Sequence, residues 1–157
     1  MSESNLPQRI LVGLDATPES TNALRMGLWL HRRLGATVEA LHVVDAPAPD
    51  DIAGRPDTIA LQLAKAMDDA GQALEDRVAR VLEEMVITDL GLTDVLRVSR
   101  GHPTQVLLDR AREIEADLIV IGPHQRRGRI DFGSTARSVL AGAPRAVWVQ
   151  PGLPREP

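Results

Sequence analysis

A run of one glycine and two hydroxyl residues carries the clearest chemistry in this sequence. Gly133, Ser134 and Thr135 stand where a polar stretch gives way to a helical pattern. A glycine lets the backbone approach a phosphate closely, and the unpaired N–H groups of a first helical turn, with two hydroxyls, donate hydrogen bonds to an anion. An ordinary helix start, with Ser134 closing the turn, explains the same residues. The residue types alone leave both interpretations open.

The polar stretch before this run concentrates positive charge. It follows Gly122, contains His124, and carries three arginines, Arg126, Arg127 and Arg129. Arginine pairs well with phosphate oxygens, so these side chains favour a phosphate site, although many loop arginines are simply solvated. His124 is a further candidate for a ligand contact because it lies in the same polar stretch.

Two more polar residues belong to apolar runs. Asp15 ends the run RILVGLD, and its carboxylate could hydrogen-bond a ribose or a base, help to hold a magnesium ion, or cap the turn. His42 alternates into the apolar run TVEALHVV. We therefore expect His42 to be a packed core histidine.

The composition excludes several classes of site. The 157 residues include no cysteine, which excludes disulfides and thiolate metal centres. Lys65 is the only lysine and lies in a helical pattern, so the P-loop of the common NTPases is absent. The only aromatic residues are Trp29, Phe132 and Trp148, which are too few to sandwich a flavin or to stack nucleobases.

The charge balance and the residue types also bear on function and location. The formal net charge is −4, whereas nucleic-acid-binding domains are usually basic. No nucleophile stands in a pattern with a base, so we expect a protein that is not an enzyme. No run of about 18 apolar residues occurs, and the N-terminus MSESNLPQRI is polar and acidic. We therefore expect no membrane partner and a cytoplasmic location.

Predicted strands and helices alternate along the chain. Nearly continuous apolar and β-branched runs predict strands, and apolar residues at three- and four-residue spacing predict helices. The predicted strands span 9–15, 37–44, 94–99, 117–121 and 146–150, and the helices span 18–34, 57–85, 104–115 and 134–140. This alternation predicts one α/β domain over 1–157, with a core of about 9–150 and a doubly wound, five-stranded parallel sheet.

This topology would bring the candidate residues to one edge of the sheet. In an open parallel sheet the ligand crevice lies beyond the carboxyl ends of the strands, where the strand order reverses. The first and fourth predicted strands end in the most polar segments, so we place the reversal between them. Residues 15–17 and 122–135 would face the crevice. Trp148, in AVWVQ, is expected either in the core or on an exposed last strand that pairs with another copy.

Taken together, these segments resemble the universal stress protein family over residues 9–150. The stretches RILVGLDATPESTNAL, GATVEALHVVD, RGHPTQVLLDRARE, ADLIVIGPHQRRG and GSTARSVL match the family in order. The resemblance implies a Rossmann-like fold of the adenine nucleotide alpha hydrolase-like kind, with strand order 3-2-1-4-5. It also implies a stress-response module, usually a homodimer.

The resemblance breaks down in part at the family's glycine pattern. One branch of the family binds ATP through Gly-x2-Gly-x9-Gly-Ser/Thr, and another branch lacks this pattern and does not bind. Here Gly122 matches the first glycine, and Gly133 with Ser134 matches the last pair, but Gln125 stands at the second glycine position. Residues 126–132 also form a spacer of seven residues instead of nine. A Cβ at Gln125 and a shorter loop would hinder the backbone from wrapping around phosphates.

By this resemblance, nine residues would surround ATP or another adenine nucleotide, which could be accompanied by Mg²⁺. Asp15 would contact the adenosine, and the backbone of Val43 would contact the adenine. Gly13 and Ile121 would be their neighbours. The residues that line the path of the ribose and phosphates, or bind the phosphates, would be Gly122, His124, Gly133, Ser134 and Thr135.

The sequence leaves two main functions open, beside slow ATP hydrolysis, for which it indicates no general base. The first is a stress-response module that binds an adenine nucleotide at the carboxyl ends of the first and fourth strands. The second is a nucleotide-free universal stress protein that acts through dimerisation along the last strand, Ala146 to Gln150, and through contacts with an unknown protein partner. No nucleic-acid partner is expected for either.

Overall fold

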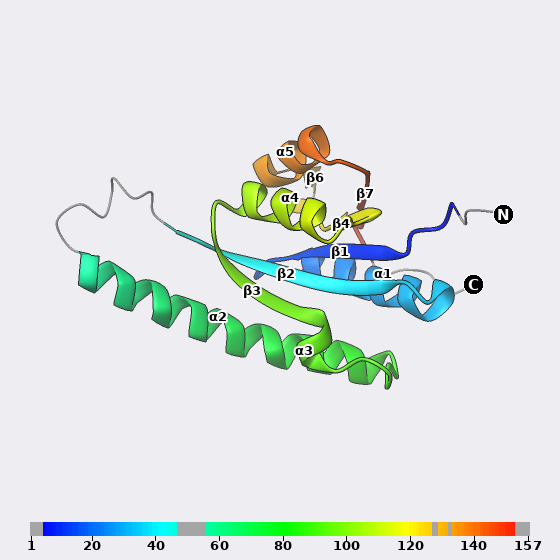
Figure 1. The fold of residues 1–157 in the computed structure, drawn as a ribbon, viewed down its shortest axis with the longest axis horizontal. Helices are drawn as coiled ribbons and strands as arrows, with labels where there is room; N and C mark the ends of the chain where they lie inside the picture. The colour runs from blue at the N-terminus through cyan, green and yellow to red at the C-terminus, as the bar shows by residue number, and fades with distance from the viewer. Residues whose placement is uncertain (1–4, 47–55, 127–128, 132, 153–157) are drawn as a thin grey trace.

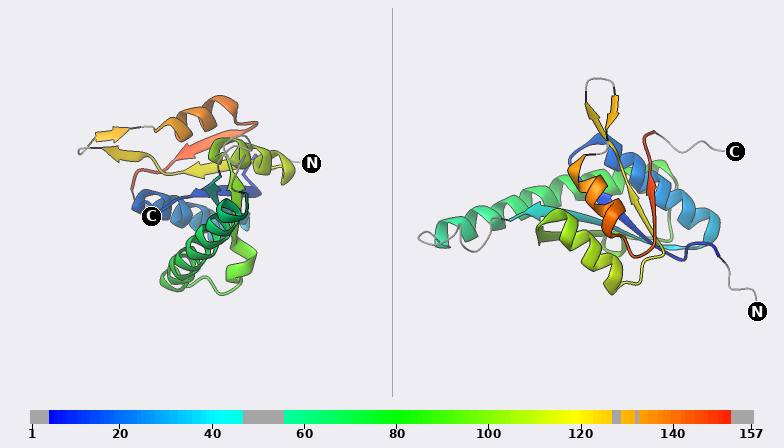
Figure 2. Two further views of the ribbon diagram at one scale, coloured as in Figure 1. Left: turned by 90° about the vertical axis from the view of Figure 1, so that its left-hand side faces the viewer. Right: turned by 90° about the horizontal axis from the view of Figure 1, so that it is seen from above.

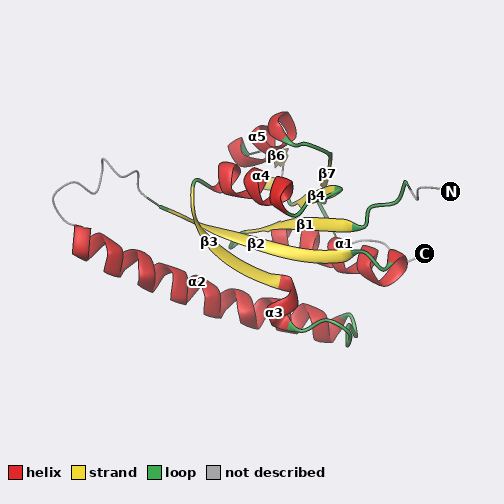
Figure 3. Cartoon of the chain, in the orientation of Figure 1, coloured by secondary structure: helices red, strands yellow, loops and turns green. Residues whose placement is uncertain are grey.

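A computed structural model describes residues 5–46, 56–126, 129–131 and 133–152. Figure 1 shows the elements, and Figure 3 shows helices lying on both sides of the strands. In chain order the elements are β1 (Arg9–Leu14), α1 (Pro18–Leu34), β2 (Thr37–Asp45), α2 (Pro56–Glu84), α3 (Leu92–Val95), β3 (Leu96–Gly101), α4 (Pro103–Glu113), β4 (Leu118–Ile121), β5 (His124–Arg126), β6 (Arg129–Asp131), α5 (Ser134–Gly142) and β7 (Ala146–Val149).

Five of the strands form one parallel sheet in the order β3-β2-β1-β4-β7. This confirms the predicted order 3-2-1-4-5, with β7 as the fifth strand of the sheet. The order reverses between β1 and β4, as the sequence predicts, because β1 pairs with β2 on one side and with β4 on the other. The carboxyl ends of these three strands therefore border one crevice.

The two faces of the sheet bury separate apolar clusters. Successive strand residues point to opposite faces, so Ile10 and Val12 pack under α1 and α2, while Leu11 packs under α4 and α5. All three side chains are almost completely buried. Burial of such a side chain stabilises the fold by about 1.5–3 kcal/mol relative to leaving it in water. The strands are apolar along their whole length because helices cover both faces.

Local signals set the bounds of α1 correctly. Thr17 is the N-cap, and its side chain accepts a hydrogen bond from the N–H of Ser20 at 3.4 Å. Pro18 occupies the first turn, where its missing N–H is not needed. Gly35 ends the helix with φ of 70°, a left-handed conformation that glycine adopts without strain. The structure therefore gives α1 the same bounds, 18–34, as the sequence predicts.

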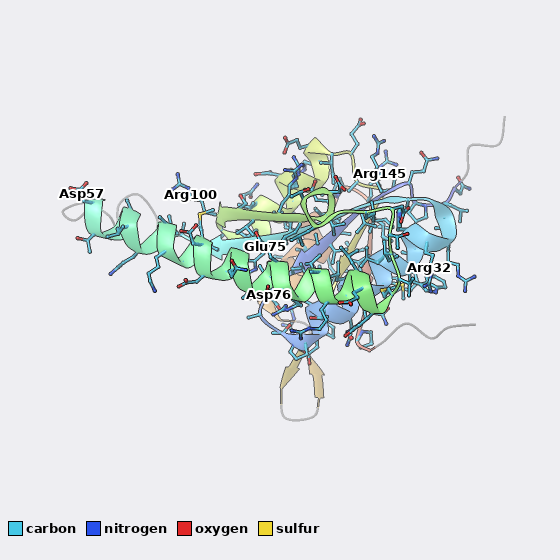
Figure 4. All side chains as sticks on the ribbon, turned by 90° about the horizontal axis from the view of Figure 1, so that it is seen from below. Arg32, Asp57, Glu75, Asp76, Arg100 and Arg145 are labelled. Atoms are coloured by element: carbon cyan, nitrogen blue, oxygen red, sulfur yellow. The ribbon has the colours of Figure 1, made fainter. Side chains whose placement is uncertain are left out.

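The longest helix extends past the sheet that it covers. Figure 1 shows α2 running beyond the strands at its N-terminal end. Its apolar stripe is buried only from Leu74 onward, whereas Leu63 and Met67 are half-buried and Leu61 is 73% exposed. In Figure 4, Asp57 marks the outer end of this helix. The apolar spacing that predicts this helix therefore marks core residues in the second half of α2 and lies largely outside the core in the first half.

The sequence did not predict the β5–β6 hairpin, which lies where it indicates loop, or α3, which overlaps the start of the predicted strand 94–99. The hairpin of β5 and β6 stands out from the body of the domain in both views of Figure 2, with Gln125 paired to Ile130. Its three-residue strands are too short to show an alternating pattern. The single turn of α3 begins at Gly91, whose N–H donates to Asp94 at 2.8 Å. As a result β3 begins two residues later than the predicted strand.

A charged cluster joins α4 to β2 and β3. Arg110 binds the Glu39 carboxylate with two hydrogen bonds, of 2.6 and 2.8 Å, and Arg97 adds a third of 3.0 Å. Burial raises the pKa of Glu39, but hydrogen bonds from Arg110 and Arg97 outweigh it and hold this pKa below its ordinary value. The bidentate geometry fixes α4 against the sheet.

Candidate functional site

A cavity of about 190 Å³ lies at the carboxyl ends of β1, β2 and β4. It occupies the place where the strand order reverses, next to the first turns of α4 and α5. Its lining residues are Gly13, Leu14, Asp15, Ser20, Leu41, His42, Val43, Pro103, Leu107, Ile121, Gly122, Thr135 and Ala136. The cavity has an apolar side and a polar side, which different elements provide.

The apolar side owes its space to Gly13. A Cβ atom at this position would lie 3.1 Å from Ile121 Cγ2 and 3.6 Å from Leu107 Cδ2. A larger side chain would therefore fill the gap between β1, β4 and α4. Leu41 and Val43, from β2, complete the apolar wall. Such a slot suits a flat, largely apolar ring.

The polar side begins with Asp15, in the turn between β1 and α1. One carboxylate oxygen, Oδ1, accepts hydrogen bonds from the N–H of Thr17 at 2.7 Å and from the Thr17 hydroxyl. The turn-capping role considered for Asp15 is therefore observed. Its second oxygen, Oδ2, makes no hydrogen bond to another described residue, so one oxygen stays available at the cavity.

Two residues that the sequence analysis missed hold this turn. Ser20 is only 2% exposed, and its hydroxyl accepts from the N–H of Asp15 at 3.1 Å and lies 3.0 Å from the carbonyl oxygens of Asp15 and Thr17. Arg77, from α2, donates to the carbonyl oxygen of Asp15. Only the spacing DATPES hinted at a capped turn, and nothing in the sequence linked Arg77 to it. The site is thus supported by a helix on the opposite face of the sheet.

His42 is not the packed core histidine that the sequence predicts. It is half-buried and lines the cavity, and its Nδ1 lies 2.9 Å from the carbonyl oxygen of Leu14. The prediction was wrong because alternation places a residue on one face of a strand but does not show where the covering helices end. His42 pairs with Leu14, the last residue of β1, so here the neighbouring strand ends and β2 borders the cavity.

The start of α5 has no side-chain cap. Gly133 is the N-cap residue, and Ser134 is the first helical residue instead of the cap. The N–H of Arg137 donates to the Gly133 carbonyl at 3.1 Å, so the N–H groups of the three residues before it have no carbonyl partner in the helix. Thr135 lines the cavity. Ser134 therefore does not close the turn as the ordinary-cap interpretation requires.

Gly122 is required by packing inside the protein. A Cβ atom there would lie 2.6 Å from the carbonyl carbon of Glu19 and 2.9 Å from the N–H nitrogen of Ser20. The exit of β4 therefore lies directly against the first turn of α1. This packing accounts for the glycine at position 122 without any ligand.

Six of the nine predicted site residues line the cavity. These are Gly13, Asp15, Val43, Ile121, Gly122 and Thr135. Gly133 and Ser134 lie beside it at the start of α5 but do not line it. His124 is the first residue of β5, and the predicted ligand contact of its side chain lies outside what the structure describes.

The arginine-rich stretch is not the loop that the sequence predicts. Arg126 and Arg129 are paired in the β5–β6 hairpin, and their side chains, like all of Arg127, lie outside the described residues. Gln125 is likewise a strand residue, since it pairs with Ile130.

Within the described residues, no three or more histidine, aspartate or glutamate side chains gather where they could hold a metal ion. None of the described helices is long and apolar enough to cross a bilayer.

Comparisons with known proteins agree on one family. The model of the Universal stress protein family matches residues 7–151. The structure of the universal stress protein UspA from Lactobacillus plantarum is 26% identical, with a TM-score of 0.69, and the match covers 91% of this chain and 97% of that chain. A search of curated protein sequences gave no match.

Two further similar structures were solved with nucleotides. A universal stress protein in complex with cAMP is 20% identical, with a TM-score of 0.66 and coverage of 92% of this chain and 97% of that chain. The universal stress protein from Archaeoglobus fulgidus in complex with dAMP is 19% identical, with a TM-score of 0.55 and coverage of 92% and 98%. At these identities the likeness shows the fold.

Proposed function

Because this chain belongs to the universal stress protein family, we propose that it binds an adenine nucleotide, with ATP as the leading candidate, in the cavity at the ends of β1, β2 and β4. The protein would act as a stress-response binding module and not as an enzyme. Solved relatives in complex with cAMP and dAMP support an adenine nucleotide as the ligand class. The observation that carries the proposal is that the slot at Gly13 and the uncapped start of α5 adjoin one cavity.

The chemistry of the lining residues fits the parts of a nucleotide. The apolar wall of Leu41, Val43 and Leu107 suits the adenine, and the open carboxylate oxygen of Asp15 suits a ribose hydroxyl. At about 190 Å³ the cavity is smaller than the ~300–1,000 Å³ of typical ligand sites. It would therefore enclose the base and sugar, while the phosphates would lie at its rim.

The phosphates would meet the first turn of α5. Unpaired N–H groups and the positive end of the helix dipole attract anions, and the hydroxyls of Ser134 and Thr135 add donors. Mg²⁺ would arrive with the nucleotide, because this ion is commonly held by one or two carboxylates together with phosphate oxygens. Asp15 supplies the carboxylate that lines the cavity.

We also propose a homodimer along β7. This strand is at the edge of the sheet, and Trp148 on it is 42% exposed. The sequence-based expectation that Trp148 marks an exposed last strand thus gains support. Val147 and Val149, in contrast, pack against the cluster under α4 and α5. They are therefore poor positions at which to test association.

The hairpin supports a second function, that of a nucleotide-free interaction protein. Gln125 stands at the position of the family's second glycine, and here it belongs to a strand instead of a loop that wraps phosphates. The protein would then act through its dimer surface and an unknown protein partner, and the cavity would have only a structural role.

The cytoplasmic location expected from the sequence stays a prediction, to be checked by cell fractionation.

Calorimetry on the purified full chain separates these functions. We expect ATP, ADP, AMP or cAMP to give a heat of binding, and mass spectrometry to find an adenine nucleotide among small molecules released from the protein. No retained nucleotide and no heat with any of the four would contradict the proposal. If the protein captures a partner protein equally well with and without nucleotide, the second function is favoured. Steady ATP turnover by rigorously purified protein would contradict the assignment as a non-enzyme.

A further inference from the structure

We infer that His42 is a specificity-determining residue of the cavity, which accepts through its Nε2 atom a hydrogen bond from a donor group of the bound nucleoside. This inference rests on the proposed function, because it concerns the same cavity. It adds a residue that neither the sequence pattern nor the family's motif indicates. The argument depends on one fixed hydrogen bond and on the position of the ring.

The hydrogen bond of Nδ1 fixes the tautomer of His42. Nδ1 lies 2.9 Å from the carbonyl oxygen of Leu14, and a carbonyl oxygen can only accept. Nδ1 must therefore carry the proton. In the neutral ring the other nitrogen, Nε2, is then an acceptor with a free lone pair. Leu14 and His42 are register partners in adjacent strands, so the backbone of the sheet sets this geometry.

The ring of His31 makes a similar hydrogen bond elsewhere in the protein. Its Nδ1 also lies against a carbonyl oxygen, that of Ala36, at 2.7 Å, but its Nε2 is engaged with Asp89 at 2.9 Å. His42 has the first of these bonds, and among the described residues its Nε2 has no hydrogen-bond partner. Since His42 lines the cavity, a ligand is the natural partner for this atom.

The ligand group must be a hydrogen-bond donor. An adenine nucleoside offers two kinds, the 6-amino group of the base and the hydroxyls of the ribose. The other polar side chains that line the cavity are Asp15, whose carboxylate is also an acceptor, Ser20, whose hydroxyl is already bonded to backbone atoms, and Thr135, at the start of α5. His42 would therefore favour nucleosides that keep their donors and would disfavour analogues that lack the one it contacts.

The variant His42→Asn tests this directly. The asparagine amide can donate to the Leu14 carbonyl from the place of Nδ1, but it has no atom at the place of Nε2. We expect its midpoint of thermal unfolding to stay close to that of the wild type, while its affinity for adenosine falls about tenfold, the effect of one lost hydrogen bond in a closed site. The matched control, His31→Asn, alters a histidine outside the cavity lining and should bind adenosine like the wild type.

Ligand analogues identify the donor. Purine riboside has a hydrogen in place of the 6-amino group, and 2′-deoxyadenosine and 3′-deoxyadenosine each lack one hydroxyl. The analogue without the contacted group should bind the wild type and His42→Asn equally, whereas the other analogues should still show the difference. The inference is overturned if His42→Asn binds adenosine as tightly as the wild type, or if the variant weakens all four ligands by the same factor.

A measurement on the unaltered protein guards against a folding defect in the variant. Nitrogen-15 NMR of the histidine rings should show Nδ1 protonated and Nε2 unprotonated in His42 of the free protein, and saturating adenosine should shift the Nε2 signal. An unchanged Nε2 signal, with adenosine bound, would refute the inference and leave the proposed function intact. No binding of adenosine or of any nucleotide to the wild type would instead refute the proposed function.

Discussion

A Cβ atom on Gly122 would stand 2.6 Å from the backbone carbonyl carbon of Glu19. The two residues belong to the exit of β4 and to the first turn of α1, so the central strands and the first helix interlock at this point. The contact is with backbone atoms, which cannot turn aside as a flexible side chain would. The first glycine of the family's nucleotide pattern therefore has a structural role here that is independent of any ligand.

Substituting this glycine should destabilise the fold itself. Gly122→Ala forces β4 and α1 apart, and we expect the free energy of unfolding to fall by about 2 kcal/mol, as for other overpacked sites. Urea unfolding followed by circular dichroism measures the change. The control is Gly71→Ala, in α2, where a Cβ would meet nothing within 4 Å. That change should raise stability by about 0.5–1 kcal/mol. Equal stability of Gly122→Ala and the wild type would contradict the packing argument.

Filling the slot at Gly13 should remove binding without unfolding the protein. In Gly13→Val the branched side chain occupies the space between Ile121 and Leu107, where the base is proposed to lie. We expect at least a tenfold loss of adenosine affinity by calorimetry, with a loss of stability of about 1–3 kcal/mol, because the new side chain is tightly packed against Ile121. Gly152→Val, in open space, is the control and should bind normally. Retained affinity in Gly13→Val would place the base elsewhere.

A negative charge at the start of α5 should weaken the binding of ATP but not the binding of adenosine, which has no phosphate. Gly133 has φ of −53° and ψ of 168°, which any residue can adopt, and aspartate is a good N-cap. Gly133→Asp should change the free energy of unfolding by no more than about 0.5 kcal/mol. Its carboxylate should repel the phosphates and lower the affinity for ATP at least tenfold, while the affinity for adenosine stays the same. Gly133→Asn caps without the charge and should weaken ATP less. If ATP binds Gly133→Asp as it binds the wild type, the phosphates do not lie there.

The sequence predicted what depends on repeated patterns. Apolar runs predicted the five strands and the reversal between the first and the fourth, and the terminal signals of α1 predicted its bounds. The complete strand order followed from the family resemblance. Topology then brought Asp15 and Thr135 to one cavity. These results need no knowledge of side-chain packing.

What the sequence could not predict depends on contacts between distant residues. Arg77 reaches Asp15 across 62 positions, and no local pattern signals such a bond. His42 lies in β2 beside the last residue of β1 and borders the cavity, so alternation misplaced it in the core. The β5–β6 hairpin has too few residues for periodicity to show.

Acid should weaken the attachment of α4 through Glu39. Its pKa in the folded protein is lowered, so the pair with Arg110 stabilises the fold above the pKa of the unfolded chain, and this stability is lost as the pH falls through the folded value. We expect Glu39→Gln to lose about 2 kcal/mol at pH 7, a difference that shrinks below about pH 4. Urea unfolding of both proteins across pH measures it. A difference that does not vary with pH would contradict the role of charge. Glu115→Gln, in an exposed pair with Arg9, should change little.

The exposed tryptophan of the edge strand should report on association. Trp148→Glu places a charge on the proposed dimer surface, and we expect light scattering to show a shift from dimer towards monomer at micromolar concentration. Leu61→Glu, on the exposed outer half of α2, is the control and should not shift the mass. A wild type that is monomeric, or a variant that stays fully dimeric, would contradict association through β7.

The buried hydroxyl of Ser20 has a kinetic consequence for the cavity. Its bonds to the N–H and carbonyl groups of the Asp15 turn, with the bond from Arg77, hold that turn in place within the protein itself. A ligand arriving there meets groups that need not be ordered first, so little conformational entropy is lost at this wall on binding. Encounter would then resemble docking to a rigid surface, and differences in affinity among nucleotides would arise mainly from how long each one stays.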